Sequence, residues 1–163
     1  MCETDQSRED LMKRTLLVGF KGKNNTSRIL VEQLSSEYLL LTNSFAGLKK
    51  DIDTISMDYD QVILFGVDKE LSSSVRIEKV AAKDKRKVLS KLDLEKIASA
   101  LGEAGIRSVI SEEPTAYLCN EAYWHILEKC SGRAVLIHVP TIKHADAEFY
   151  ERMKLWKTQQ ESI

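Results

Sequence analysis

Cysteine, proline and long apolar runs are all scarce in this sequence. Three cysteines in 163 residues are too few, and an odd number, for a disulfide framework, so we predict a reducing, cytoplasmic setting. Two prolines and seven glycines leave no linker rich in either residue. The longest apolar runs, such as Leu16–Phe20 and Ala134–Ile137, are far too short to span a bilayer. The polar, acidic start of the chain lacks the apolar core of a signal peptide.

An excess of charge of either sign is also missing. The 24 basic and 25 acidic residues give a formal net charge of −1, which favours neither nucleic acid nor an anionic membrane as a partner. One basic run, Lys83–Lys91, stands out, and we interpret it as a solvated loop in preference to a phosphate or nucleic-acid site. Hydrophobic residues at 43% and charged residues at 30% are typical of a globular protein.

Short apolar stretches alternate with amphipathic ones along most of the chain. This alternation predicts an α/β fold with a mostly parallel, twisted sheet flanked by helices. Runs such as VILF and AVLIHV predict strands that are covered on both faces. The predicted strands are Arg14–Gly19, Tyr38–Thr42, Gln61–Gly66, Val75–Ala81, Arg107–Ile110 and Arg133–Val139. We expect one domain over residues 14–163, preceded by a polar lead-in over residues 1–13.

Four helices are predicted between and after these strands. Asparagines near residue 25 cap the first, and Asp93 and Gly105 begin and end the second. The third begins near Pro114, a residue suited to a first helical turn, and runs through Leu127. The last begins near Ala145. Trp124 and Trp156 fall in these helices and are interpreted as packing residues.

Three residues of this layout have the chemistry of a nucleophilic site. Cys119 lies in the opening turns of a predicted helix, and His138 ends the strand that follows it. An imidazole beside a thiol can take its proton and later return it to a departing amine. Glu78, inside an apolar strand, is costly to bury without a partner, and a histidine would provide one. Taken singly, each residue fits a core or surface role better than a catalytic one.

Motifs around these residues resemble those of the pyroglutamyl peptidase I family of cysteine peptidases. The family segment S-x-x-A-G-x-Y-x-C-N is similar to Ser111–Asn120, and its F-x-H-V-P segment is similar to LIHVP around His138. The family's I-E-R-x-A-x-N segment is matched by Ile77–Lys83, and its glycine-containing opening by LLVGFKGKNNTS. The likeness is collinear and extends over nearly the whole chain.

The resemblance implies a three-layer α/β/α fold of the phosphorylase/hydrolase-like kind, a function and a set of residue roles. Cys119 would be the nucleophile, His138 the general acid and base, and Glu78 the carboxylate that orients the imidazole. Phe20 and Tyr117 would line the pocket for the pyroglutamyl ring. The implied substrate is a peptide with an N-terminal pyroglutamate or a similar small acyl amide. Neither a metal nor an organic cofactor is required. Whether the chain forms a homo-oligomer is left open.

Other functions remain open beside this one. Pro114 and Thr115 replace the family's Ala-Gly, and the segment after the acidic strand is shorter, both of which favour an altered-specificity or non-catalytic relative that acts in binding or assembly. A metal site is disfavoured because the residues available lack tight ligand spacing; these are Cys119, His125, Cys130, His138 and His144. Nucleoside phosphorylases share the predicted architecture, but no glycine-rich phosphate loop supports that activity.

Overall fold

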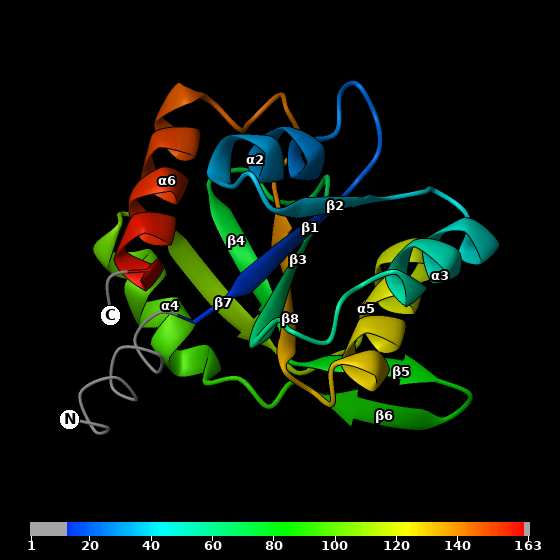
Figure 1. The fold of residues 1–163 in the computed structure, drawn as a ribbon. Coiled ribbons are helices and arrows are strands. Elements are labelled where there is room, and N and C mark those ends of the chain that lie inside the picture. The colour runs from blue at the N-terminus through cyan, green and yellow to red at the C-terminus, as the bar shows by residue number, and fades with distance from the viewer. Residues whose placement is uncertain (1–12, 162–163) are drawn as a thin grey trace.

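A six-stranded sheet with five helices around it forms the described part of the molecule (Figure 1). The computed structural model describes residues 13–161. The strands of the main sheet are β1 (Thr15–Phe20), β2 (Tyr38–Leu41), β3 (Gln61–Val67), β4 (Ser74–Glu78), β7 (Arg107–Ser111) and β8 (Ala134–Val139). A separate hairpin consists of β5 (Val80–Lys83) and β6 (Arg86–Leu89). The helices are α2 (Thr26–Leu34), α3 (Phe45–Asp53), α4 (Leu94–Glu103), α5 (Tyr117–Lys129) and α6 (Ala147–Glu161).

The main sheet is mostly parallel, as the alternating pattern predicts. Its strand order is β2-β1-β3-β8-β4-β7, and only the β4–β8 pair is antiparallel. The strands β4 and β7 therefore begin at the edge of the sheet where β3 and β8 end. This reversal brings the start of β4 and the end of β8 to the same edge.

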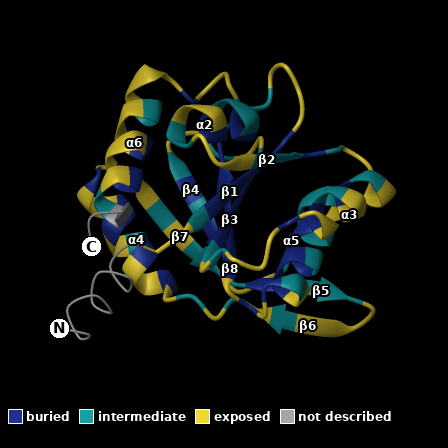
Figure 2. Ribbon diagram, in the orientation of Figure 1, coloured by how far each residue is buried: buried dark blue, intermediate teal, exposed yellow. Residues whose placement is uncertain are grey.

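Two apolar clusters on opposite faces of the sheet make the three layers. On one face, α2, α4 and α6 pack against the sheet through residues such as Leu30, Leu101 and Trp156. On the other face, α3 and α5 pack through residues such as Leu48 and Leu127. The burial pattern follows this arrangement, with the central strands buried and the outer helix faces exposed (Figure 2). The predicted α/β fold is confirmed.

The residues predicted to begin and end helices are found at the ends of α2 and α4. The side chain of Asn25 accepts a hydrogen bond from the backbone N–H of Ser27 at the start of α2, and Asp93 accepts one from Lys96 at the start of α4. Gly105 follows α4 with a φ of 88°, a left-handed conformation that favours glycine.

The region after Glu78 differs from the prediction. The expected single strand Val75–Ala81 divides at Lys79 into β4 and β5. The basic run expected as a loop instead forms β6, which pairs antiparallel with β5 around Asp84 and Lys85. Both turn residues have positive φ, as a two-residue hairpin turn of type I′ requires. The prediction was wrong here because the turn lacks the Asn-Gly or Asp-Gly signal.

Two helices also differ from the prediction. The helix expected to begin near Pro114 begins instead at Tyr117, and residues 114–116 precede it in non-helical conformation. The helix α3 was not predicted; only Leu48 and Ile52 of its nine residues are buried, so its apolar pattern is weak. Among the described residues, none of the helices has the length and apolar character needed to cross a membrane.

Candidate active site

Glu78, His138 and Cys119 come from three elements and meet above the antiparallel pair of β4 and β8. Glu78 is the last residue of β4, His138 is the penultimate residue of β8, and Cys119 lies in the first turn of α5. Glu78 and His138 are 1% and 3% exposed, while Cys119 is half-buried. Only residues 130–133 separate α5 from β8, so the chain turns back at once and β8 runs beneath the helix that carries the thiol.

The imidazole of His138 is held by the carboxylate of Glu78. Its Nδ1 lies 3.1 Å from Glu78 Oε2. An ionised carboxylate only accepts hydrogen bonds, so this contact places the ring proton on Nδ1 when the imidazole is neutral. The other nitrogen, Nε2, then carries a free lone pair that can accept a proton.

Gly66 leaves the space in which the thiol and the imidazole meet. A Cβ built on this glycine would stand 2.8 Å from Cys119 Sγ and 3.2 Å from both Cδ2 and Nε2 of His138. The sulfur and Nε2 therefore border the same point above β3. Any side chain at this position would push the two groups apart.

The guanidinium of Arg76 extends the site beside both Glu78 and His138. Arg76 Nε donates to Glu78 Oε2 at 2.7 Å, and its Nη2 donates to Asp68 Oδ2 at 2.6 Å. The same Nη2 lies 3.4 Å from His138 Nδ1. Glu78 Oε2 thus accepts from Arg76 and faces His138 as well, which fixes the carboxylate in one orientation. Sequence reasoning missed Arg76 and Asp68.

The thiol is protonated at neutral pH. Burial, together with the negative charges of Asp68 and Glu78, raises the pKa of Cys119 to about 11. Although burial opposes its charge, the hydrogen bonds from the Glu70 backbone and the Arg76 guanidinium lower the pKa of Asp68, which keeps that carboxylate ionised. Attack by the sulfur therefore requires a base that removes the proton as the new bond forms.

The first turn of α5 presents backbone N–H groups beside the thiol. Its N-cap residue, Ala116, makes no side-chain cap hydrogen bond. The first N–H groups of a helix have no partner within the helix and suit a negatively charged oxygen. Tyr117, which opens the helix, has a φ of 58°, an unusual value for a bulky residue. Strained backbone of this kind is found at functional sites.

Solved structures of pyrrolidone carboxyl peptidases share this arrangement of strands and helices. The enzyme from Thermococcus litoralis superposes with a TM-score of 0.74 at 17% identity, over 92% of this chain and 93% of that one. Pyroglutamyl peptidase I from Bacillus amyloliquefaciens gives a TM-score of 0.76 at 15% identity, over 93% of this chain and 100% of that one. The chain has the pyrrolidone carboxyl peptidase fold.

The similarity to these peptidases lies in the fold and not in the sequence. The pyrrolidone carboxyl peptidase from Thermus thermophilus superposes with a TM-score of 0.74, yet only 15% of residues are identical over 90% of this chain and 99% of that one. No family model matches the sequence, and no curated protein sequence matches it significantly. The roles of individual residues on this peptidase fold therefore depend on the geometry of the site.

Phe20 and Tyr117 occupy different surroundings in this peptidase fold. Phe20 ends β1, is 4% exposed, and belongs to the apolar cluster against which Leu118 and Cys119 pack. Tyr117 is 87% exposed, although it is only two residues from the nucleophile. Phe20 thus lies in the layer beside the thiol, and Tyr117 lies at its surface. Their contact with a pyroglutamyl ring stays a prediction.

Two further side chains support the site from within α5. The buried hydroxyl of Tyr123 donates to the backbone carbonyl of Glu78 at 2.7 Å, which ties the helix to the end of β4. The amide of Asn120 both donates to Ala82 O at 2.7 Å and accepts from Ala82 N at 3.0 Å. Asn120 belongs to the motif around Cys119, whereas no sequence signal indicates the contact of Tyr123.

The histidines and cysteines do not gather into a metal centre within residues 13–161. No group of three or more His, Cys, Asp and Glu side chains is placed to hold a metal ion in this part of the chain. His125 instead lies 2.8 Å from Glu121, one turn earlier on α5. Cys119 and Cys130 are both free thiols, at opposite ends of that helix.

Proposed function

We propose that this protein is a cysteine hydrolase that removes an N-terminal pyroglutamyl residue from peptides. One observation carries the proposal: Cys119 Sγ and His138 Nε2 border the same point above Gly66, while Glu78 holds Nδ1 of the same ring. A thiol, a base and an orienting carboxylate in this order are the parts needed for acyl transfer.

The reaction begins from a neutral thiol and a neutral imidazole. His138 Nε2 takes the proton of Cys119 while the sulfur attacks the carbonyl carbon that follows the pyroglutamyl ring. The carbonyl oxygen becomes an oxyanion, and the free N–H groups at the start of α5 stabilise it. Collapse of this intermediate breaks the C–N bond, and the imidazolium gives its proton to the leaving amine.

Water completes the cycle. His138 removes a proton from a water molecule, whose oxygen attacks the thioester, and the same proton then returns to the sulfur as free pyroglutamate leaves. Glu78 stabilises the imidazolium in both halves of the cycle without itself taking the proton. Arg76 keeps Glu78 in place through its 2.7 Å hydrogen bond.

The acyl group in this proposal is the pyroglutamyl ring. Its support is the motif around Cys119 and His138 together with the names of the enzymes that share the fold. Phe20 would contact the ring from β1, and Tyr117 would cover it from the surface. A cytoplasmic location, where the thiol remains reduced, is part of the proposal.

A non-catalytic binding role is the second candidate. The observation that favours it is the raised pKa of Cys119, about 11, which leaves almost no thiolate at neutral pH without help from the base. In that case the pocket would bind a pyroglutamyl peptide without cleaving it.

Turnover of a pyroglutamyl aminomethylcoumarin amide separates the two functions. The wild-type protein, assayed under reducing conditions, should release the coumarin, and Cys119→Ala should abolish the release. Cys130→Ala is the matched control, because Cys130 is a buried thiol at the other end of α5 and should be dispensable. A folded wild-type protein that binds the amide without turnover, or turnover that survives Cys119→Ala, contradicts the proposal.

A further inference from the structure

One lateral row of residues runs from the thiol to the edge of the sheet. Gly66 pairs with His138, His138 pairs with Arg76, and Arg76 pairs with Val109. Directly paired residues point to the same face of a sheet. The face that carries the active site therefore continues over β4 and β7.

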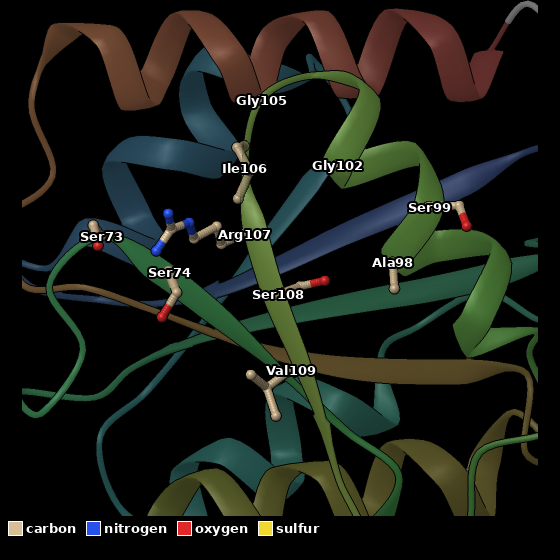
Figure 3. Close-up of a pocket in the computed structure, with 10 residues that line it drawn as sticks. All are labelled: Ser73, Ser74, Ala98, Ser99, Gly102, Gly105, Ile106, Arg107, Ser108 and Val109. Carbon is tan, nitrogen blue, oxygen red and sulfur yellow. The ribbon is translucent and has the colours of Figure 1, made fainter.

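This continuation is open to solvent. Val109 is 62% exposed, and the side chain of Arg76 is 26% exposed. A groove of about 830 Å³ lies along β7, where it is bordered by the start of β4 and by α4 (Figure 3). The groove follows the edge of the sheet, and α4 borders it on the face opposite the active site. Arg107 and Val109 alternate with Ser108 along β7, so both lie on the active-site face.

The leaving peptide must lie on this side of the thiol. His138 has to reach the leaving nitrogen to protonate it, and the sheet order places His138 between Gly66 and Arg76. With the acyl ring on the Phe20 side, as in the proposed function, the peptide that follows the scissile bond would extend over β4 and β7.

A positive charge lies at the edge of the groove that faces the active site. The Arg107 side chain is exposed and has no hydrogen-bonding or ionic partner among residues 13–161. Figure 3 shows it extending toward the hydroxyl-bearing Ser73 and Ser74. Arg76 is already paired with Asp68 and Glu78, so of these two described arginines Arg107 is the one left to bind a ligand. A planar guanidinium beside hydroxyl groups is suited to a carboxylate.

We propose that Arg107, where this groove meets the active-site face, binds the substrate downstream of the scissile bond and favours peptides with acidic side chains there. The inference rests on the proposed function. Neighbouring strands are about 4.8 Å apart, so β7 lies about 10 Å from His138, which an extended peptide covers in about three residues. The carboxylate is therefore expected on the second or third residue after the pyroglutamyl amide.

Matched amidated peptides test this preference. The substrates are pyroglutamyl-Ala-Glu-Glu-amide and its Gln-Gln and Lys-Lys counterparts, with the pyroglutamyl coumarin amide as a substrate that lacks the downstream residues. We expect kcat/KM to be about tenfold higher for the Glu-Glu peptide than for the Lys-Lys peptide, and this ratio should fall in high salt. Arg107→Gln should bring the ratio to about two or less. The control is Arg133→Gln, an exposed arginine immediately before β8, at its opposite end from His138.

The outcomes distinguish the two proposals. Cleavage of the coumarin amide with equal rates on the three peptides overturns the downstream site and leaves the proposed function intact. A preference for Glu-Glu that Arg107→Gln does not change also overturns it. Failure to cleave the coumarin amide or any peptide refutes the proposed function, and the downstream site is refuted with it.

Discussion

Replacing Gly66 with alanine inserts one methyl group between the thiol and the imidazole. The new Cβ would lie 2.8 Å from Cys119 Sγ and 3.2 Å from His138 Nε2. Ordinary contacts between such atoms are about 3.5–4.0 Å, so the sulfur has to move by about 1 Å. Gly66 has no positive φ, so the alanine backbone itself is unstrained.

The effect on rate should greatly exceed the effect on stability. A displacement of about 1 Å in a reacting group costs about 100-fold in rate, while overpacking a site of this kind costs about 1–3 kcal/mol of unfolding free energy. We expect Gly66→Ala to lower kcat/KM for the coumarin amide at least 100-fold while the protein remains folded in thermal denaturation.

Gly102→Ala provides the matched control. Apart from its chain neighbours and the backbone of its own helix, no atom lies within 4 Å of the position that its Cβ would occupy, and the residue lies within α4. This variant should keep full activity and gain up to about 1 kcal/mol in stability, because alanine favours helix over glycine. If Gly66→Ala keeps more than about a third of wild-type activity, the close approach of thiol and imidazole is not what drives the reaction.

Further variants test the groups around the thiol. Glu78→Gln should lower kcat at least 100-fold with little change in KM, measured with the coumarin amide, because the imidazolium loses its ionised partner; an unchanged kcat would contradict this role. Arg76→Met leaves two carboxylates facing each other and should cost about 2 kcal/mol in urea unfolding; an unaltered midpoint would show that the ion pairs contribute nothing. Tyr123→Phe removes a buried hydrogen bond to Glu78 and should cost about 1–3 kcal/mol in the same assay. Alkylation of Cys119 by iodoacetamide, followed by peptide mapping, should accelerate about tenfold per pH unit from pH 7 to pH 10, because its pKa of about 11 keeps the thiolate scarce below that value; a rate independent of pH would indicate a preformed thiolate.

The sheet was predictable because its strands are continuous apolar runs. Residues such as Val62–Phe65 and Val135–Ile137 are buried on both faces, and this requirement appears directly in the sequence. The direction of β4 was not predictable, because the period of a strand is the same whichever way it runs. The same holds for the division after Glu78, where β4 and β5 are separated by one residue.

The residues of the candidate site also fall into two groups, those that the sequence indicated and those that only the fold revealed. Cys119, His138 and Glu78 were found through motifs, each of which lies within a short stretch of sequence. Arg76 and Asp68 belong to the same cluster, but their contacts arise from the antiparallel pairing of β4 with β8 and from a loop after β3. No local sequence pattern indicates these contacts, so only the fold reveals them.

Trapping of the acyl-enzyme tests the central claim most directly. Intact-protein mass spectrometry during turnover of the pyroglutamyl coumarin amide, quenched in acid, should detect one pyroglutamyl group per chain, and peptide mapping should locate it on Cys119. Cys119→Ala should carry none. Turnover without a covalent adduct on Cys119, or an adduct that persists in Cys119→Ala, would contradict nucleophilic catalysis by this thiol.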